Sequence, residues 1–383
     1  MRKKIVPLLK DPNNHQPGFR LFGSIVHRGA TQLTNLTDQE LEQEDDIEEG
    51  LLISTSSNTA YPIEGFVAIL LSDTDVDLNH HQPLLQKFKG KIPQEFEEVL
   101  NATLGRLSAA RDSADGTWNR EEMRYYDKEV STVEQRNKML KAIREVPVWR
   151  IFLPRKKHII DILAKEISNK YLLEIGSGNS RTVYWEFNPS KFHYNYIGSD
   201  ISFKRLLVAK QAIPEGDFFQ ASALNLPFLD NSFYTVLSFG MLHHLPRPAD
   251  AVKSSYALVK SNGFFAFHEP IIKPELKLPG MNTFRKTMTT YEHSDHDGKI
   301  DYDQVKDLLH SYGFKQISIH RQISIFRSFS ETIIKNISRS ILNNKSVIKT
   351  IEFLDEIPLN TLGRISRRAG ASAAFSVFRK TSN

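Results

Sequence analysis

The sequence predicts an α/β fold with a doubly wound, Rossmann-like parallel sheet, and three observations lead to it. An apolar strand at 171–175 runs directly into a glycine-rich turn, Gly176-Ser177-Gly178. A second apolar strand ends at Asp200, about 24 residues after the first glycine, close to the ~20 expected for a ribose-binding carboxylate. Apolar and helical segments then alternate as far as residue 311, which is typical of a parallel sheet covered by helices.

The predicted elements follow one another in a regular order. A helix begins near residue 157, ahead of the first strand. Further strands are expected at 194–197, 217–220, 233–239 and 264–267, and helices at 203–212, 249–259 and 302–311. Ligands of such folds bind beyond the carboxyl ends of the strands. A strand and helix joined by a short Gly-x-Gly turn are weak evidence for a nucleotide-type ligand when they stand alone. The acid at the end of the next strand strengthens that evidence.

The remaining segments predict two flanking parts around a central domain at 116–325. Residues 1–115 are expected to form a small accessory α+β domain, with a strand pair at 51–53 and 61–71 and helices from 93 onward. The acidic stretch 39–49 is expected to be a solvated loop or a frayed helix. Residues 326–383 are expected to add a helix at 331–342 and an edge strand at 373–379 that complete the central domain.

The amino-acid composition excludes several kinds of site. The sequence has no cysteine, which excludes disulfides, thiolate zinc sites and cysteine nucleophiles. It has no apolar stretch near the roughly 20 residues of a membrane helix, and residues 1–10 lack the apolar core of a signal peptide, so we expect a cytoplasmic protein without membrane contact. Acidic residues dominate the first 115 positions and basic residues the rest. The basic part permits a nucleic-acid partner, but its scattered charges, without a dense run, favour an ordinary basic surface.

Several further motifs, taken together with the glycine turn, resemble one family. They are Leu-Pro-Phe at 226–228, Asn-Ser-Phe at 231–233, Met-Leu-His-His-Leu at 241–245, Leu-Val-Lys-Ser-Asn-Gly at 258–263 and Glu-Pro at 269–270. The sequence from about 150 to 325 is similar to the type-11 class I methyltransferases. The resemblance implies S-adenosylmethionine as the cofactor and methyl transfer as the activity.

The same resemblance implies which residues hold the cofactor. The methionine half would lie beside Glu174, Gly176, Ser177 and Gly178, the ribose beside Asp200 and Ile201, and the adenine beside Ser222 and Ala223, with Tyr126 folded over the cofactor. The sequence departs from the family pattern at three positions. Ser222 replaces the acid that accepts from the adenine amino group, Ser180 replaces a third glycine, and Tyr234 replaces an acid in the fourth strand.

His243 and His244 are the candidate catalytic residues, with His244 slightly favoured because it lies nearer the following turn. Methyl transfer needs a positioned acceptor, and a general base only where the acceptor must lose a proton. A capping or packing role for the two histidines is an equal alternative. His268 and Glu269 end the next strand and are candidates for substrate contact.

A second resemblance concerns residues 54–65. Their Ser54-x-x-Ser57-x-x-x-Tyr-Pro-Ile pattern resembles a small zinc ribbon related to a tRNA-methyltransferase activator, with serines in place of two cysteines. Serine hydroxyls do not replace thiolates on zinc, so we expect no metal there. His293 and His296, with Asp295 between them, could in principle form an alternative metal group, although exposed polar loop residues are the commoner explanation.

These observations favour an enzyme that methylates an oxygen or nitrogen atom of a small molecule such as a sugar or secondary metabolite. Three alternatives stay open: an RNA methyltransferase, an enzyme that cyclises or cleaves S-adenosylmethionine without methyl transfer, and a binding protein without activity. The fold does not choose among them, and the sequence does not indicate an oligomeric state.

Overall fold

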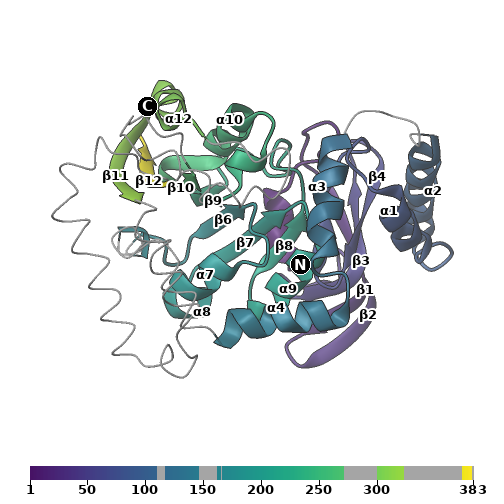
Figure 1. The fold of residues 1–383 in the computed structure, drawn as a ribbon. Helices are drawn as coiled ribbons and strands as arrows, with labels where there is room; N and C mark the ends of the chain where they lie inside the picture. The colour runs from purple at the N-terminus through teal and green to yellow at the C-terminus, as the bar shows by residue number, and fades with distance from the viewer. Residues whose placement is uncertain (110–116, 146–161, 165, 271–299, 323–372, 382–383) are drawn as a thin grey trace, which may run out of the picture.

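The computed structural model describes residues 1–109, 117–145, 162–164, 166–270, 300–322 and 373–381 (Figure 1). The expected linker at 112–116, most of the expected helix from residue 157, the histidine-containing segment at 291–296 and the expected helix at 331–342 lie outside these residues. Among the residues that are described, no helix is both long and apolar enough to cross a membrane.

Twelve described strands form one mixed sheet in the order β11-β12-β10-β9-β6-β7-β8-β5-β4-β3-β1-β2. The strands of the predicted central domain are β6 (Tyr171–Ile175), β7 (Asn195–Asp200), β8 (Asp217–Gln220), β9 (Phe233–Phe239), β10 (Val259–Pro270), β11 (Phe314–Gln322) and β12 (Ala373–Lys380). Strands β6 to β10 pair in parallel, which confirms the predicted parallel unit. Three of the predicted strands, at 171–175, 217–220 and 233–239, have the observed bounds.

The expected edge position of the C-terminal strand is wrong. Strand β12 lies between β10 and β11 and runs antiparallel to both, and β11 forms the edge. The sequence did not reveal β11 because an edge strand carries weak apolar patterning, and Ile317 and Ile319 are indeed exposed.

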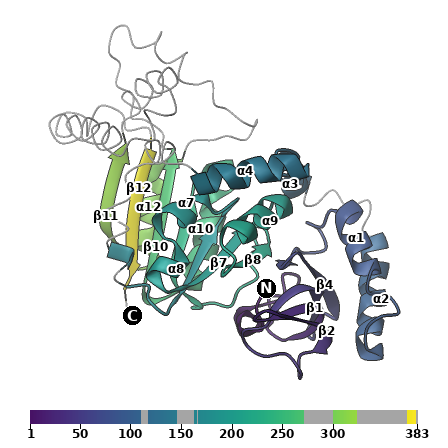
Figure 2. The same cartoon turned by 90° about the horizontal axis from the view of Figure 1, so that it is seen from below.

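Helices cover both faces of the sheet, as a doubly wound fold requires. Adjacent strand residues alternate between two cores: Leu172 belongs to one cluster and Leu173 to the other. The first core includes α3 (Thr117–Lys128), α4 (Val133–Glu145), α7 (Arg181–Glu186) and α9 (Phe203–Ala212), and the second includes α10 (Pro248–Leu258) and α12 (Tyr302–Ser311). A short helix, α8 (Pro189–Phe192), precedes β7. Figure 2 shows α3, α4 and α9 grouped on one side.

The N-terminal residues extend the same sheet. Their elements are the 3-10 helix η1 (Lys3–Leu8), the strands β1 (Phe19–Arg28), β2 (Thr31–Thr37), β3 (Asp46–Ser54), β4 (Thr59–Glu64) and β5 (Val67–Ile69), and the helices α1 (Leu78–Gln86) and α2 (Gln94–Ala109). Strand β5 pairs in parallel with β8, placing Val67 opposite Phe218. The predicted strand pair is therefore present, but it belongs to a larger sheet than a separate small domain would have.

The acidic stretch 39–49 is not wholly a loop, because β3 begins at Asp46. Its carboxylates have cationic partners that the linear sequence did not reveal. Lys210 Nζ lies 2.7 Å from Asp46 Oδ2, and Arg28 Nη2 lies 2.7 Å from Asp45 Oδ2. Because their charges are paired, Asp46 can lie in strand β3 and Asp45 in the turn before it.

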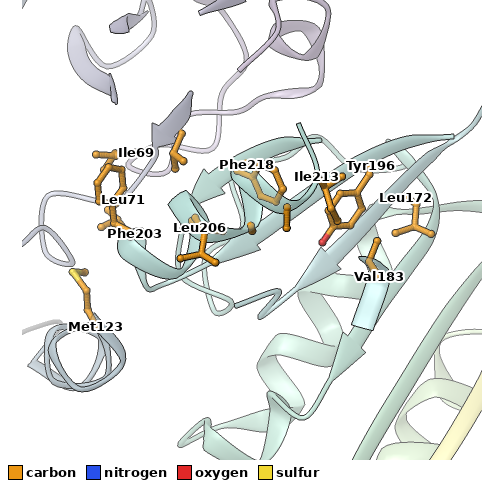
Figure 3. Packing of buried hydrophobic residues seen from close by; sticks show 14 of the residues in the cluster. Ile69, Leu71, Met123, Leu172, Val183, Tyr196, Phe203, Leu206, Ile213 and Phe218 are labelled. Atoms are coloured by element: carbon orange, nitrogen blue, oxygen red, sulfur yellow. The ribbon is translucent and has the colours of Figure 1, made fainter. Parts of the chain in front are cut away.

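A continuous apolar core joins the N-terminal strands to the central domain (Figure 3). Ile69 and Leu71 pack in the same buried cluster as Phe203 and Leu206 of α9 and Met123 of α3. The division at residues 115 and 325 stays a prediction, since the sheet and the core both run across the first of these positions.

Candidate active site

The glycine turn after β6 has the backbone conformation that its sequence predicts. Gly176 and Gly178 have φ values of +65° and +53°, in the left-handed region that favours glycine. A Cβ atom on Gly176 would lie 2.2 Å from Cγ of Met241, a residue of the loop after β9. Gly176 is therefore required for the close approach of this second loop, in addition to any approach of a ligand.

Asp200 at the end of β7 is tied to the glycine turn. The Gly178 amide donates to Asp200 Oδ2 at 2.7 Å, and the Ser202 amide donates to Oδ1 at 2.8 Å. Burial raises the pKa of Asp200, and these two backbone hydrogen bonds oppose the rise. The carboxylate is thus held at the carboxyl ends of two neighbouring strands, the position predicted for a ribose contact.

A buried hydrogen-bonded group lies beneath the turn. The Tyr196 hydroxyl donates to Glu174 Oε2 at 2.5 Å and hydrogen-bonds to Ser180 Oγ at 2.8 Å. Burial and the charge of Glu174 raise the pKa of Tyr196 well above its usual value, so the phenol stays a donor. Ser180 adopts a φ of 54°, the conformation that the absent third glycine would take. Glu174 and Ser180 therefore support the turn from below.

Ser222 stands where the family has an acid, and its neighbours include residues that carry no motif in the sequence. Ser222 Oγ lies 3.4 Å from Asn119 Oδ1 of α3, and Asn119 Nδ2 donates to Asp75 Oδ1 at 2.6 Å. The Leu224 amide donates to Ser222 Oγ at 3.3 Å. Nearby, the carbonyl of Ile201 accepts from Gln220 Nε2 at 2.9 Å, and Ala223 packs against the second core.

Helix α3 brings Tyr126 to the same end of the sheet. Its hydroxyl lies 3.2 Å from His244 Nδ1, and the guanidinium of Arg205 lies 4.1 Å above the Tyr126 ring. Arg205 also borders the glycine turn, since its Nη1 would be 3.9 Å from a Cβ on Gly178. Asp127 fixes the helix by accepting from Ser202 Oγ at 2.6 Å.

The two candidate histidines have different partners. His243 Nδ1 lies 2.7 Å from Glu269 Oε2, and the carboxyl group is fully buried at 0% exposure. Glu269 Oε1 accepts from the amides of Met241 and Leu242, each at 3.0 Å. The His244 ring lies 4.0 Å from the His243 ring at 38°. Both histidines belong to the short 3-10 helix η3 (Leu242–His244).

His268 and Tyr234 have aromatic or polar partners of their own. The His268 ring packs edge-on against Phe375 of β12, with ring centres 6.0 Å apart. Tyr234 lies near the start of β9, about 17 Å from its carboxyl end at roughly 3.3 Å per residue, and its hydroxyl donates to Glu166. The loss of an acid at position 234 therefore has no direct bearing on this site.

Comparison with known proteins agrees with the geometry. Residues 173–267 match the family model described as a methyltransferase domain. This part of the chain is a class I methyltransferase domain. Its cofactor is S-adenosylmethionine.

The relatives cover only parts of the chain. A demethylmenaquinone methyltransferase from Paenarthrobacter aurescens is 29% identical over 122 residues, which span 30% of this chain and 46% of that protein. The chain thus matches about half the length of this relative. Two solved structures are also similar: YcgJ from Bacillus subtilis (18% identity, 59% of this chain and 99% of that one, TM-score 0.39) and phosphoethanolamine N-methyltransferase 2 from Haemonchus contortus (14%, 72% and 60%, TM-score 0.38).

The residues of the methyltransferase domain fit its adenosyl cofactor. Beside Gly178, a Cβ would meet only the Arg205 side chain, and at no less than 3.9 Å, so the turn is open to a ligand. Ser177 Oγ is buried and has no hydrogen-bond partner among the described residues. An open glycine turn, a free hydroxyl and a held carboxylate are the groups that a nucleoside with a charged amino-acid tail requires.

No metal centre is visible in the residues that the structure describes, where no three His, Asp or Glu side chains come together. The ribbon-like serines join a hydrogen-bonded group instead. Ser57 Oγ donates to Asp11 Oδ2 at 2.5 Å, and Tyr61 donates to Asp11 Oδ1 at 3.1 Å. The expectation of a protein without zinc stays a prediction, and His293 and His296 lie outside the described residues.

Proposed function

We propose that this chain transfers the methyl group of S-adenosylmethionine to an oxygen or nitrogen atom of a small molecule, and that His243 accepts the proton of the acceptor. The observation that carries the proposal is the hydrogen bond of 2.7 Å between His243 Nδ1 and the buried Glu269 carboxylate.

The hydrogen bonds of Glu269 support one tautomer of the His243 ring. Both oxygens of Glu269 accept hydrogen bonds, two from backbone amides and one from the imidazole. An ionised carboxylate is an acceptor only, so Nδ1 carries the hydrogen and Nε2 is the basic nitrogen of the ring. When Nε2 takes a proton, the adjacent carboxylate stabilises the resulting imidazolium. A base of this kind serves an acceptor hydroxyl or ammonium, which must lose a proton.

The other residues position the reactants. The bound cofactor supplies an activated methyl group on a sulfonium. Gly178 leaves room for it, Asp200 would accept from ribose hydroxyls, and Met241 and His244 would border the place where an acceptor approaches. Tyr126 hydrogen-bonds to His244, so α3 covers this end of the sheet and limits access of water.

The experiment incubates the purified chain with S-adenosylmethionine and separate panels of small hydroxyl compounds, amines and tRNA, and identifies products by mass spectrometry. We expect S-adenosylhomocysteine to form only with a small-molecule acceptor. Methylation of tRNA alone would contradict the acceptor class, and methylthioadenosine formed without an acceptor would indicate cleavage of the cofactor. His243→Asn should lower turnover by ~10²–10⁴, and His244→Asn should lower it less because Nδ1 of that ring is engaged by Tyr126.

A further inference from the structure

We infer that Asn119, oriented by Asp75, recognises the amino group of the cofactor's adenine in place of the acid that Ser222 has replaced. The inference rests on the proposed placement of the cofactor and deepens it. It assigns adenine recognition to a residue of α3 and to a residue of the N-terminal segment, neither of which belongs to the sequence that matches the family.

The sheet brings these residues to the base. Asp200 and Gln220 are directly paired across β7 and β8, and neighbouring strands are about 4.8 Å apart. A ribose held by Asp200 therefore places its base over the end of the next strand, β8. Ser222 follows that strand directly and is buried, and Asn119 Oδ1 lies 3.4 Å from its hydroxyl.

Asp75 determines which way the Asn119 amide faces. An aspartate carboxylate only accepts hydrogen bonds, so the amide nitrogen of Asn119 must point toward it, as the 2.6 Å contact shows. The amide oxygen then faces the opposite way, toward Ser222. Such an oxygen has two lone pairs, one of which can accept from Ser222 and the other from a second donor. An exocyclic amino group is a donor of the required kind.

The orientation is fixed by the surroundings of Asp75. Ser72 Oγ donates to Asp75 Oδ2 at 2.7 Å, and the Asp75 amide donates to the Ser72 carbonyl at 2.9 Å. Asp75 and Asn119 are only 7% and 8% exposed, so water does not compete strongly for the pair. In this arrangement Asp75 does not touch the adenine. It orients the Asn119 amide, whose oxygen accepts from the base in place of the acid that is absent at Ser222.

The test compares the binding of S-adenosylhomocysteine and S-inosylhomocysteine, whose base carries an oxygen where adenine carries its amino group. The wild-type chain should bind the adenosyl compound at least about tenfold more tightly, because the inosine oxygen meets another acceptor. Asp75→Asn introduces a second amide that can accept or donate, so Asn119 can turn and donate to the inosine oxygen. We expect the affinity ratio to fall to within about threefold of one.

Asp73→Asn is the matched control, since Asp73 lies two positions away and contacts Asn13 and Arg106 instead. It should keep the wild-type ratio. Asn119→Ala, which removes the acceptor, should also abolish the preference if Asp75→Asn does not fold. An unchanged ratio in Asp75→Asn or Asn119→Ala, or a wild-type chain that binds both compounds equally, would overturn the inference while leaving the cofactor site intact. A wild-type chain that binds neither compound would overturn the proposed function as well.

Discussion

Glu269→Gln tests the proposed base with a change of one atom. The amides of Met241 and Leu242 both donate to Oε1, so the glutamine must keep its carbonyl oxygen there and present its amide nitrogen to His243. An amide nitrogen donates, which forces His243 Nδ1 to accept and moves the ring hydrogen to Nε2. The basic nitrogen that the proposal requires would then be lost, although the shape of the site is kept.

The size of the effect follows from the electrostatics of the pair. An imidazolium and a carboxylate with charge centres ~4 Å apart attract by about 4 kcal/mol at an effective dielectric constant of ~20. Since each 1.36 kcal/mol changes a rate by about tenfold, loss of this attraction predicts a decrease in kcat of roughly 10³. The estimate lies within the ~10²–10⁴ usual for removal of a general base.

The assay is single-turnover methyl transfer to an acceptor found in the screen, together with calorimetric titration of S-adenosylhomocysteine. We expect the single-turnover rate constant to fall while the affinity for S-adenosylhomocysteine changes by less than about twofold, because Glu269 does not contact the glycine turn or Asp200. The rate of the variant should rise at high pH, where solvent can take the proton. Glu166→Gln, at the opposite end of β9, serves as the control. Full activity in Glu269→Gln would refute the reasoning.

Three further results are expected. Asp200→Ala should weaken binding of S-adenosylmethionine by about 1.5–3 kcal/mol in calorimetry, because charge-assisted ribose hydrogen bonds are lost, and equal affinity would place the ribose elsewhere. Burial lowers the pKa of His81 to about 4. The fold therefore favours its neutral form, and chemical denaturation should show stability that is full above pH ~6.5 and declines by roughly 3 kcal/mol toward pH ~4, a decline that His81→Gln should reduce. Elemental analysis should find no stoichiometric zinc, since Ser54 and Ser57 replace the thiolates; its presence would direct attention to His293 and His296.

The central domain could be predicted well because its signals are local. Strands such as 171–175 and 233–239 are short, largely apolar segments bounded by turns, and the helix at 203–212 begins at a Ser202 cap that accepts from the Arg205 amide. Strand β2 was missed because its pattern is not local. Residues 31–37 contain polar side chains that are largely exposed, and they become a strand only by pairing with β1.

Some residues of the candidate site could likewise be predicted from local sequence, and others could not. Gly176 and Asp200 stand at fixed offsets from a strand and could be selected from the sequence. Asn119 could not, because it meets Ser222 across 103 residues and Asp75 across 44. Adjacent histidines pose a different problem: His243 and His244 have the same local sequence signal, and only the three-dimensional position of Glu269 distinguishes them.

The N-terminal strand β5 both covers a sheet edge and leads the chain to the candidate site. Without β5, strand β8 would be an open sheet edge beside the proposed adenine position, with unpaired amides and carbonyls. Ile69 pairs with Gln220, and the Leu70 amide donates to the Gln220 carbonyl at 2.9 Å, so the chain leaving β5 runs past the end of β8. Asp75 follows five residues later and meets Asn119. The pairing that covers the edge therefore also positions the carboxylate that contacts Asn119, so a segment without a catalytic motif is brought to the adenine position that we propose.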